Sequence, residues 1–270
     1  MKCIALCSLL ILAGCATKQT DSDSIASLLA SGSFVDLTYT FNEQTVYWPT
    51  AEGFEFEFGT AGETPGGFYY EAHSYRGAEH GGTHLDAPIH FFRDRQTVDQ
   101  IPVANLIGAA VVVDVSTDVS DDPDYQIRPG DLLAWEEMNG RIPEGSILLF
   151  RTGFGQFWPD RASYLGTDER GSEAVAKLHF PGIHPEAAQW IVNNRKIAAV
   201  GIDTASLDRG QSTLFESHQV LFEQNIPGFE NVANLEALPA AGSFVMALPM
   251  KIDKGSGAPL RIVAWIPDTN

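Results

Sequence analysis

The eleven residues from His80 to His90 restrict the local structure of this chain more than any other segment. Four potential metal ligands stand in it: His80, His84, Asp86 and His90. A helix is disfavoured, because Gly81-Gly82 and Pro88 each oppose helix formation. A helix would also turn Asp86 and His90 roughly 240–280° away from His80, at about 100° per residue. In an extended segment, residues of even number share one side, so we expect an extended chain with a bend at Gly81-Gly82.

Two imidazoles and one carboxylate form a donor set suited to Zn²⁺ or Mn²⁺, and they leave positions free for water and substrate. The alternative is that these side chains are ordinary surface or core residues without a metal. The chain has only 7 His, and three of them stand in this segment beside an Asp. This concentration favours a metal site over the alternative.

The segment resembles the H-x-G-T-H-x-D-x-P-x-H motif of the cyclase family, which includes bacterial kynurenine formamidases (arylformamidases) and isatin hydrolases. The resemblance runs from about Val35 to the end of the chain. It implies that His80, His84 and Asp86 bind metal and that His90 is the catalytic acid/base. It also implies a single-domain α/β chain with the swivelling β/β/α fold and a mixed central sheet, assembled as a homo-oligomer, a dimer or a tetramer.

The same resemblance implies a second half of the site. In the formamidase branch a His and a Glu twelve positions apart complete a centre for two metal ions, and His218 and Glu230 have that spacing. Taken alone, His218 would be a residue on a helix surface and Glu230 a solvated loop charge. Three further candidates lie in a stretch similar to G-x-D-x-x-S-x-D: Asp203, Ser206 and Asp208. The two carboxylates could orient ligand imidazoles or simply cap turns, and Ser206 could contact substrate.

The amino terminus predicts export. Residues 1–14 have a positive start and an apolar core too short to span a bilayer, as in a signal peptide. Leu12-Ala13-Gly14-Cys15 resembles the bacterial lipoprotein box, which implies cleavage before Cys15, lipidation of its thiol and, with Ala16 following, the outer membrane. An ordinary secretory signal is the alternative. We expect residues 15–31 to be a tether and residues 32–270 to be the hydrolase domain.

The mature chain would then contain no cysteine beyond the anchor, so its metal ligands must be His and carboxylates. The 17 Lys and Arg against 35 Asp and Glu argue against a nucleic-acid partner and against adsorption to anionic lipid. The expected partner is a small-molecule substrate, with membrane contact only through the lipid at Cys15.

Strands and helices alternate along the chain. Aromatic, β-branched or apolar runs predict strands at 34–40, 68–75, 109–115, 146–151, 197–202, 243–247 and 260–266. Helices are predicted at 130–138, 185–194 and 213–224. Aromatic residues that could wall a pocket, or belong to the core, are Trp48, Phe91, Phe92, Phe154 and Trp158.

The expected reaction is hydrolysis of an amide C–N bond by activated water, using one or two Zn²⁺ or Mn²⁺ ions. The sequence contains no G-x-S-x-G motif, so it does not suggest a serine nucleophile in place of activated water. The leading hypothesis is an arylformamidase acting on N-formylkynurenine or a related aryl formamide. An alternative is a hydrolase of a cyclic amide or lactone such as isatin. A different class is a non-catalytic envelope lipoprotein that binds a metal or small molecule. Export to the periplasmic side counts against tryptophan breakdown, which is generally cytoplasmic.

Overall fold

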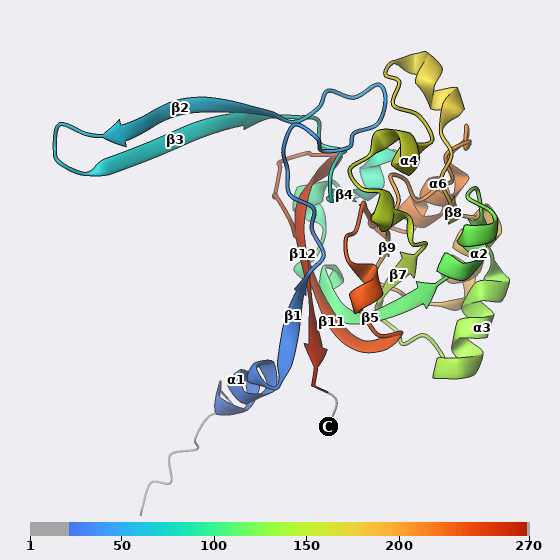
Figure 1. Cartoon of the computed structure of the whole chain (residues 1–270). Coiled ribbons are helices and arrows are strands. Elements are labelled where there is room, and N and C mark those ends of the chain that lie inside the picture. Colours follow the sequence, from blue (N-terminus) through green and yellow to red (C-terminus); the bar gives the residue numbers. More distant parts are fainter. Residues whose placement is uncertain (1–21, 269–270) are drawn as a thin grey trace, which may run out of the picture.

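The computed structural model describes residues 22–268 and contains a large mixed sheet with helices packed outside it (Figure 1). In spatial order the sheet comprises β1 (Gly32–Asp36), β12 (Gly257–Pro267), β11 (Ala241–Pro249), β5 (Ile107–Asp114), β7 (Ile147–Arg151), β9 (Ala199–Ile202), β10 (Gly228–Glu230) and β4 (His84–Asp86). The helices are α1 (Ser22–Ala30), α2 (Ser116–Asp121), α3 (Pro129–Asn139), α4 (Arg161–Leu165), α5 (Pro185–Asn194) and α6 (Glu216–Glu223).

Two small sheets and several short helical turns complete the fold. One small sheet pairs β2 (Glu55–Glu63) with β3 (Tyr69–Arg76), and the other pairs β6 (Gln126–Ile127) with β8 (Gly182–Ile183). The 3₁₀ turns are η1 (Pro88–His90), η2 (Val98–Gln100), η3 (Val103–Asn105), η4 (Phe154–Phe157), η5 (Ser172–Lys177) and η6 (Leu235–Ala237).

Strand β12 closes the large sheet into a barrel. Its last residues pair with β1, its middle pairs with β11, and its first three residues pair with β4 at the other edge. Strands β5, β7, β9 and β10 run parallel to one another, whereas β4 pairs antiparallel with both neighbours. The closure removes the free sheet edge beside β4, which carries two of the candidate ligands.

Alternate residues of the central strands enter two different cores. On β7, Leu148 and Phe150 pack in the core under the helices, whereas Ile147 and Leu149 pack inside the barrel. Strand β5 divides its valines in the same way. This period of two is the consequence of side chains pointing to opposite faces along a strand. Both faces are therefore covered, which explains the nearly continuous apolar runs of these strands in the sequence.

The expected α/β class with a mixed central sheet is confirmed. All seven predicted strands and the three predicted helices have counterparts, and the helix at Pro185–Asn194 has the expected limits. The helix predicted at 213–224 begins later, at Glu216, because Phe215 adopts a left-handed conformation with φ of 51°. The short strands β4 and β10 and the whole of β2 were not predicted.

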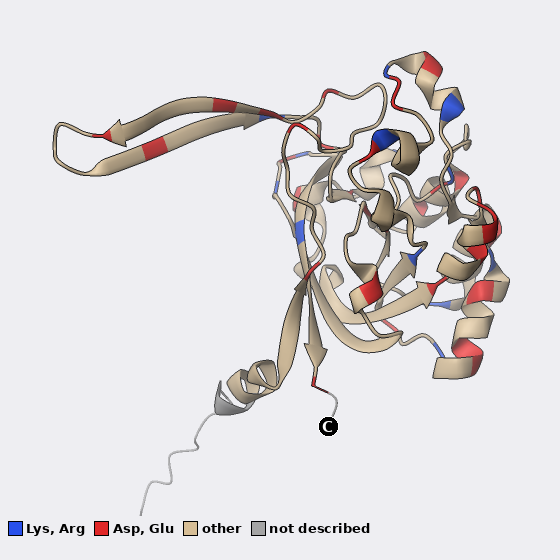
Figure 2. Cartoon of the chain, viewed as in Figure 1, with Lys and Arg blue, Asp and Glu red and all other residues tan. Residues whose placement is uncertain are grey.

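Of the features predicted for the amino terminus, only those from residue 22 onward lie within the described residues. The signal peptide of residues 1–14 and the lipidation site Cys15 lie outside the described residues. Within the predicted tether, Ser22–Ala30 form helix α1. No helix within residues 22–268 has the length and apolar character needed to span a membrane. Asp and Glu are distributed over the helices and loops of the body (Figure 2).

Candidate metal centre

The register between β4 and β10 brings the two halves of the predicted site together. His84 lies opposite Glu230, and Asp86 lies opposite Gly228. His84 and Asp86 therefore project from one face of β4, while Leu85 between them is fully buried in the barrel core. The prediction that residues of even number share one side of an extended segment is thus correct for His84 and Asp86.

His80 reaches the same place because the chain bends at Gly81-Gly82. A β-carbon on Gly81 would stand 2.0 Å from the ring of Tyr47, so only glycine allows this close approach. Gly82 has a φ of +58°, a conformation that favours glycine. Beyond the bend, His80 Nδ1 lies 2.6 Å from Asp86 Oδ1. The expected bend at these two glycines is present.

The fifth candidate, His218, comes from α6 and is fully buried. Its Nε2 lies 3.0 Å from Glu230 Oε1 and 3.4 Å from Asp86 Oδ2. Asp208 accepts hydrogen bonds from the backbone N–H and from Nδ1 of His218, the latter at 2.6 Å. Asp208 therefore fixes both the position and the ring orientation of this histidine.

Donor atoms of these residues converge in two groups. One group contains His80, His84 and Asp86, the other contains Asp86, His218 and Glu230, and within each group the potential ligand atoms lie within 4.8 Å of one another. Asp86 belongs to both groups. Its Oδ1 faces His80 and His84, and its Oδ2 faces His218. The donor set therefore fits one cation or two cations bridged by Asp86.

Hydrogen bonds on the outer nitrogen of each imidazole decide which nitrogen faces the cluster. His84 Nδ1 donates to Gly82 O at 2.9 Å, and His218 Nδ1 donates to Asp208. His80 Nε2 donates to Ser256 Oγ, whose own proton goes to Glu79. Each inner nitrogen is therefore left with a lone pair, as a metal ligand requires.

These lone pairs point at carboxylates. His84 Nε2 is buried without a hydrogen-bond partner, although Asp86 Oδ1 is 3.1 Å away and Glu230 Oε2 is 3.5 Å away. A lone pair facing two carboxylate oxygens in a buried site is unfavourable unless positive charge lies between them. The side chains present thus fit a divalent cation.

The charges of the cluster agree with this interpretation. Burial opposes protonation of His84, but the carboxylates of Asp86 and Glu230 raise its pKa to about 9. Burial together with the charge of Asp86 raises the pKa of Glu230. Protons and metal ions therefore compete for the same positions, as at other sites with imidazole ligands.

His90 lies in the same cavity but outside both donor groups. The expectation that it continues an extended segment is wrong, because Pro88 begins the 3₁₀ turn η1, which contains His90. The turn nevertheless returns its ring to the cluster, where it stacks on His80 with centroids 3.7 Å apart. This place suits a proton carrier beside the donor groups.

A cavity of about 300 Å³ opens onto the cluster. Aromatic side chains form its wall: Tyr47, Trp48, Phe91 and Phe215. Of the aromatic residues considered from the sequence, Trp48 and Phe91 line this cavity, Phe92 packs in the core, Trp158 stacks on Tyr39, and Phe154 lines a different cavity. Tyr47 and Phe215 were missed, since nothing near them in sequence marks them as neighbours of the metal segment.

The three further candidates, Asp203, Ser206 and Asp208, take different positions relative to the donor cluster. Ser206 lines the cavity, and Asp208 contacts His218. Asp203 instead accepts hydrogen bonds from the backbone N–H groups of Thr152 and Gly153 and from the Thr152 hydroxyl. It thereby fixes the loop after β7 rather than a ligand imidazole.

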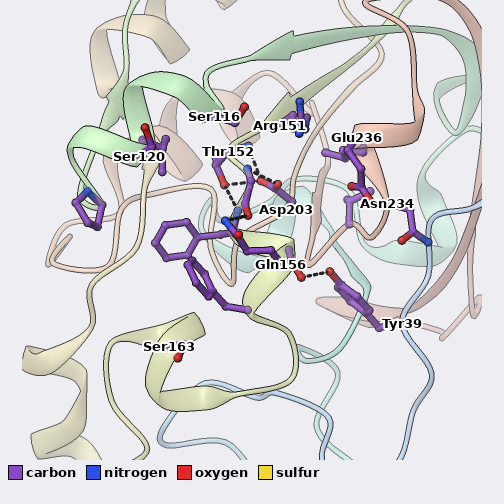
Figure 3. Close-up of a pocket in the computed structure, with 18 of the residues that line it drawn as sticks. Tyr39, Ser116, Ser120, Arg151, Thr152, Gln156, Ser163, Asp203, Asn234 and Glu236 are labelled. Carbon is purple, nitrogen blue, oxygen red and sulfur yellow. Dashed lines mark hydrogen bonds between the residues drawn. The ribbon is translucent and has the colours of Figure 1, made fainter.

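Asp203 lines a second, larger cavity of about 860 Å³ with Tyr39, Arg151 and Gln156 (Figure 3). None of the five candidate ligands lines this cavity. The donor cluster and the larger cavity are thus separate features of the described chain.

Comparison with known proteins places this arrangement in a family. A family model described as "Putative cyclase" matches residues 35–209. The chain belongs to the cyclase family. It is 34% identical over 197 residues to isatin hydrolase of Roseibium aggregatum, covering 70% of this chain and 72% of that protein. It is 28% identical over 229 residues to kynurenine formamidase of Salinibacter ruber, covering 85% of this chain and 95% of that protein.

Solved structures of the family share the fold. The structure of isatin hydrolase A from Ralstonia solanacearum superimposes with a TM-score of 0.82 at 32% identity, covering 93% of this chain and 99% of that one. The expectation of the family fold is confirmed. The relatives named above are hydrolases, and this cyclase-family protein is a hydrolase whose donor cluster fits a divalent cation.

Proposed function

We propose that this hydrolase cleaves the amide C–N bond of a small aryl amide, using one or two Zn²⁺ or Mn²⁺ ions. The observation that supports this most is the position of the donor cluster at the floor of an aromatic-walled cavity of about 300 Å³. Aromatic walls favour a flat aromatic substrate, and the cavity volume suits a molecule of one or two rings.

A bound divalent cation would supply hydroxide at neutral pH and polarise the amide carbonyl. The candidate ligands for it are His80, His84, Asp86, His218 and Glu230. His90, exposed at the cavity and free of the donor groups, would accept the proton of the attacking water. It would then deliver this proton to the leaving nitrogen, so that the acyl group gains OH and the nitrogen gains H.

Two substrate types fit this chemistry. A cyclic aryl amide of the isatin type is favoured by the higher identity to isatin hydrolase. An aryl formamide such as N-formylkynurenine is favoured by the spacing of His218 and Glu230 and by the formamidase relatives. The non-catalytic lipoprotein hypothesis is not supported, since both sets of relatives are hydrolases.

A substrate panel tests the proposal. Purified protein would be assayed on isatin, N-formylkynurenine, simple aryl formamides and a lactone, with Zn²⁺ or Mn²⁺ added. We expect turnover of at least one aryl amide that a chelator abolishes and added metal restores. No turnover of any amide by protein with full metal occupancy would overturn the proposal. Elemental analysis of the same sample shows which metal is bound. It also shows whether each chain holds one ion or two.

We also propose that the enzyme is exported and lipid-anchored through Cys15, most simply at the outer membrane. The support is the lipoprotein-box sequence before Cys15. Metabolic labelling with a fatty acid would test it: label is expected in the native chain and not in Cys15→Ser. Label retained by Cys15→Ser, or none in either chain, would contradict the anchor while leaving the catalytic proposal intact.

A further inference from the structure

Asn231 follows the candidate ligand Glu230 directly, at the end of β10. It is buried, and its backbone has a φ of 52°. This left-handed conformation is uncommon for residues other than glycine, and Asn is among the few that adopt it readily. The backbone N–H of Asn231 donates to Thr204 O in the loop after β9. The backbone of Asn231 is thus held in place independently of its side chain.

Two contacts join Asn231 to the bend that precedes His84. Its side-chain Nδ2 donates to Gly82 O at 2.8 Å, and the Thr83 hydroxyl donates to Asn231 O at 2.7 Å. Asn231 and Thr83 are both buried, so water cannot replace either partner. A buried hydrogen bond of this kind is costly to remove, because the group left behind stays unsatisfied. Asn231 therefore fixes the bend from the end of β10.

The carbonyl oxygen of Gly82 is shared by two donors. It accepts from Asn231 Nδ2 at 2.8 Å and from His84 Nδ1 at 2.9 Å. A carbonyl oxygen has two lone pairs, so both bonds can be made together. The bond from His84 keeps the proton on Nδ1 and leaves the lone pair of Nε2 toward the donor cluster. The direction of this carbonyl thus decides which nitrogen His84 presents, and Asn231 fixes that direction.

The orientation of the Asn231 amide follows from its two partners. Gly82 O can only accept, so the amide nitrogen must face it. The amide oxygen then faces the Tyr164 hydroxyl, which donates to it at 2.8 Å. Burial raises the pKa of Tyr164 well above its usual value, so the hydroxyl keeps its proton. The reversed amide would place two acceptors against each other at Gly82, and Tyr164 therefore helps to select the observed orientation.

Tyr164 stands at a fixed point of the fold. It is fully buried in α4, and Trp158 packs edge-on against its ring with centroids 5.3 Å apart. Asp160 caps this helix by accepting hydrogen bonds from the backbone N–H groups of Ala162 and Ser163. A chain of contacts therefore leads from α4 through Asn231 and the Gly82 carbonyl to His84.

We propose that Asn231 is a positioning residue for His84 and that Tyr164 orients its amide for this role. The inference rests on the divalent cation of the proposed function and adds the residues that hold one of its ligands. Asn231 acts through the Gly82 carbonyl and not by coordination. Residues that hold a ligand histidine typically change metal affinity about 10–100-fold, and one intervening carbonyl favours the lower end of that range.

The affinity of the full chain for Zn²⁺, measured in mild detergent by competition with a chelator, tests the proposal. Because Asn231 also lines the cavity, metal binding is measured without substrate. Asn231→Gly removes the amide and keeps a residue that accepts a positive φ, and its Kd for Zn²⁺ should rise about tenfold. Asn234→Gly is the matched control. Asn234 has a φ of 53° but donates to Asp36 O, so its loss should leave Zn²⁺ affinity unchanged.

Tyr164→Phe is the second variant, and it tests the orienting hydroxyl separately. It should weaken Zn²⁺ binding by less than Asn231→Gly, since the amide keeps its bond to Gly82 O. Trp135→Phe controls for general destabilisation. Trp135 is buried in α3 and donates to Val112 O at 2.9 Å, outside the donor cluster. Its loss should lower stability in urea and leave Zn²⁺ affinity at the wild-type value.

Wild-type affinity in Asn231→Gly would overturn the proposal, and so would an equal loss in Asn234→Gly or Trp135→Phe. Unchanged affinity in Tyr164→Phe would overturn the part assigned to the tyrosine. A wild-type chain that binds neither Zn²⁺ nor Mn²⁺ would overturn this inference and the metal chemistry together. Weaker binding in Asn231→Gly, with no amide hydrolysed by the metal-loaded wild type, would support the positioning role and overturn the proposed function alone.

Discussion

The rings of His80 and His90 lie face to face, with centroids 3.7 Å apart and planes inclined by 19°. His80 belongs to a donor group and His90 does not, although both line the same cavity. The stack therefore places a histidine that lies outside the donor groups directly beside one that belongs to a donor group. In the proposed mechanism, this relationship assigns metal binding and proton transfer to different histidines of one motif.

His90→Ala should keep its metal and lose most turnover. General acid–base catalysis contributes typically about 10²–10⁴-fold, so kcat should fall by that range. Elemental analysis and steady-state kinetics on the same sample measure both quantities. Wild-type turnover in the variant would remove the acid/base assignment.

Asp86→Ala should lose metal as well as activity. Asp86 supplies oxygens to both donor groups, so its removal affects every position that a cation could take. Metal content after dialysis should fall well below that of His90→Ala. Full occupancy in this variant would show that Asp86 is not a ligand.

Asp208→Asn should weaken metal binding about 10–100-fold, because its carboxylate holds His218 with Nε2 toward the cluster. Competition with a chelator of known affinity measures the change. Asp203→Asn is the matched control. Asp203 is equally buried, at 3% exposure for both residues, but it binds the loop after β7. Its metal affinity should stay near wild type, and equal losses in both variants would indicate a general effect of burial.

Arg161→Met should raise KM several-fold with little change in kcat. Arg161 donates to the carbonyl of Tyr47 at 2.9 Å and so holds the segment that forms the cavity wall. Loss of this hydrogen bond should loosen the wall without touching the donor cluster. Arg141→Met is the control, since Arg141 binds Asn194 O instead. A fall in kcat with unchanged KM would contradict the positioning role.

Glu136→Gln should destabilise the fold by on the order of 1 kcal/mol at pH 7, because Glu136 binds Arg195 through two oxygens. The Arg195 hydrogen bonds hold the pKa of Glu136 below its usual value. Its contribution is therefore complete above the unfolded pKa, near 4.5, and is lost as pH falls through the lower folded pKa. Urea unfolding at pH 7 and pH 3 should show the two proteins converging at the lower pH, and a constant difference would exclude the charge effect.

Local sequence patterns predicted much of the fold and part of the site. The buried strands and the helix at Pro185–Asn194 were predictable, because apolar runs and Pro at a first-turn position act within a few residues. Strands β4 and β10 have three residues each and no local signal of that kind. They form because distant segments pair with them.

The sequence by itself determined the donor types, their spacing and the bend at Gly81-Gly82, since these depend on residue identity and short-range sterics. Only the tertiary structure decided how the donors meet. Glu230 reaches His84 through the register of β10 on β4, and Asp86 stands between two donor groups because α6 brings His218 to its other oxygen. The exposure of β2 and β3, which project from the body (Figure 1), could not be predicted from the sequence either. Exposure is a property of the whole fold and not of alternating residues.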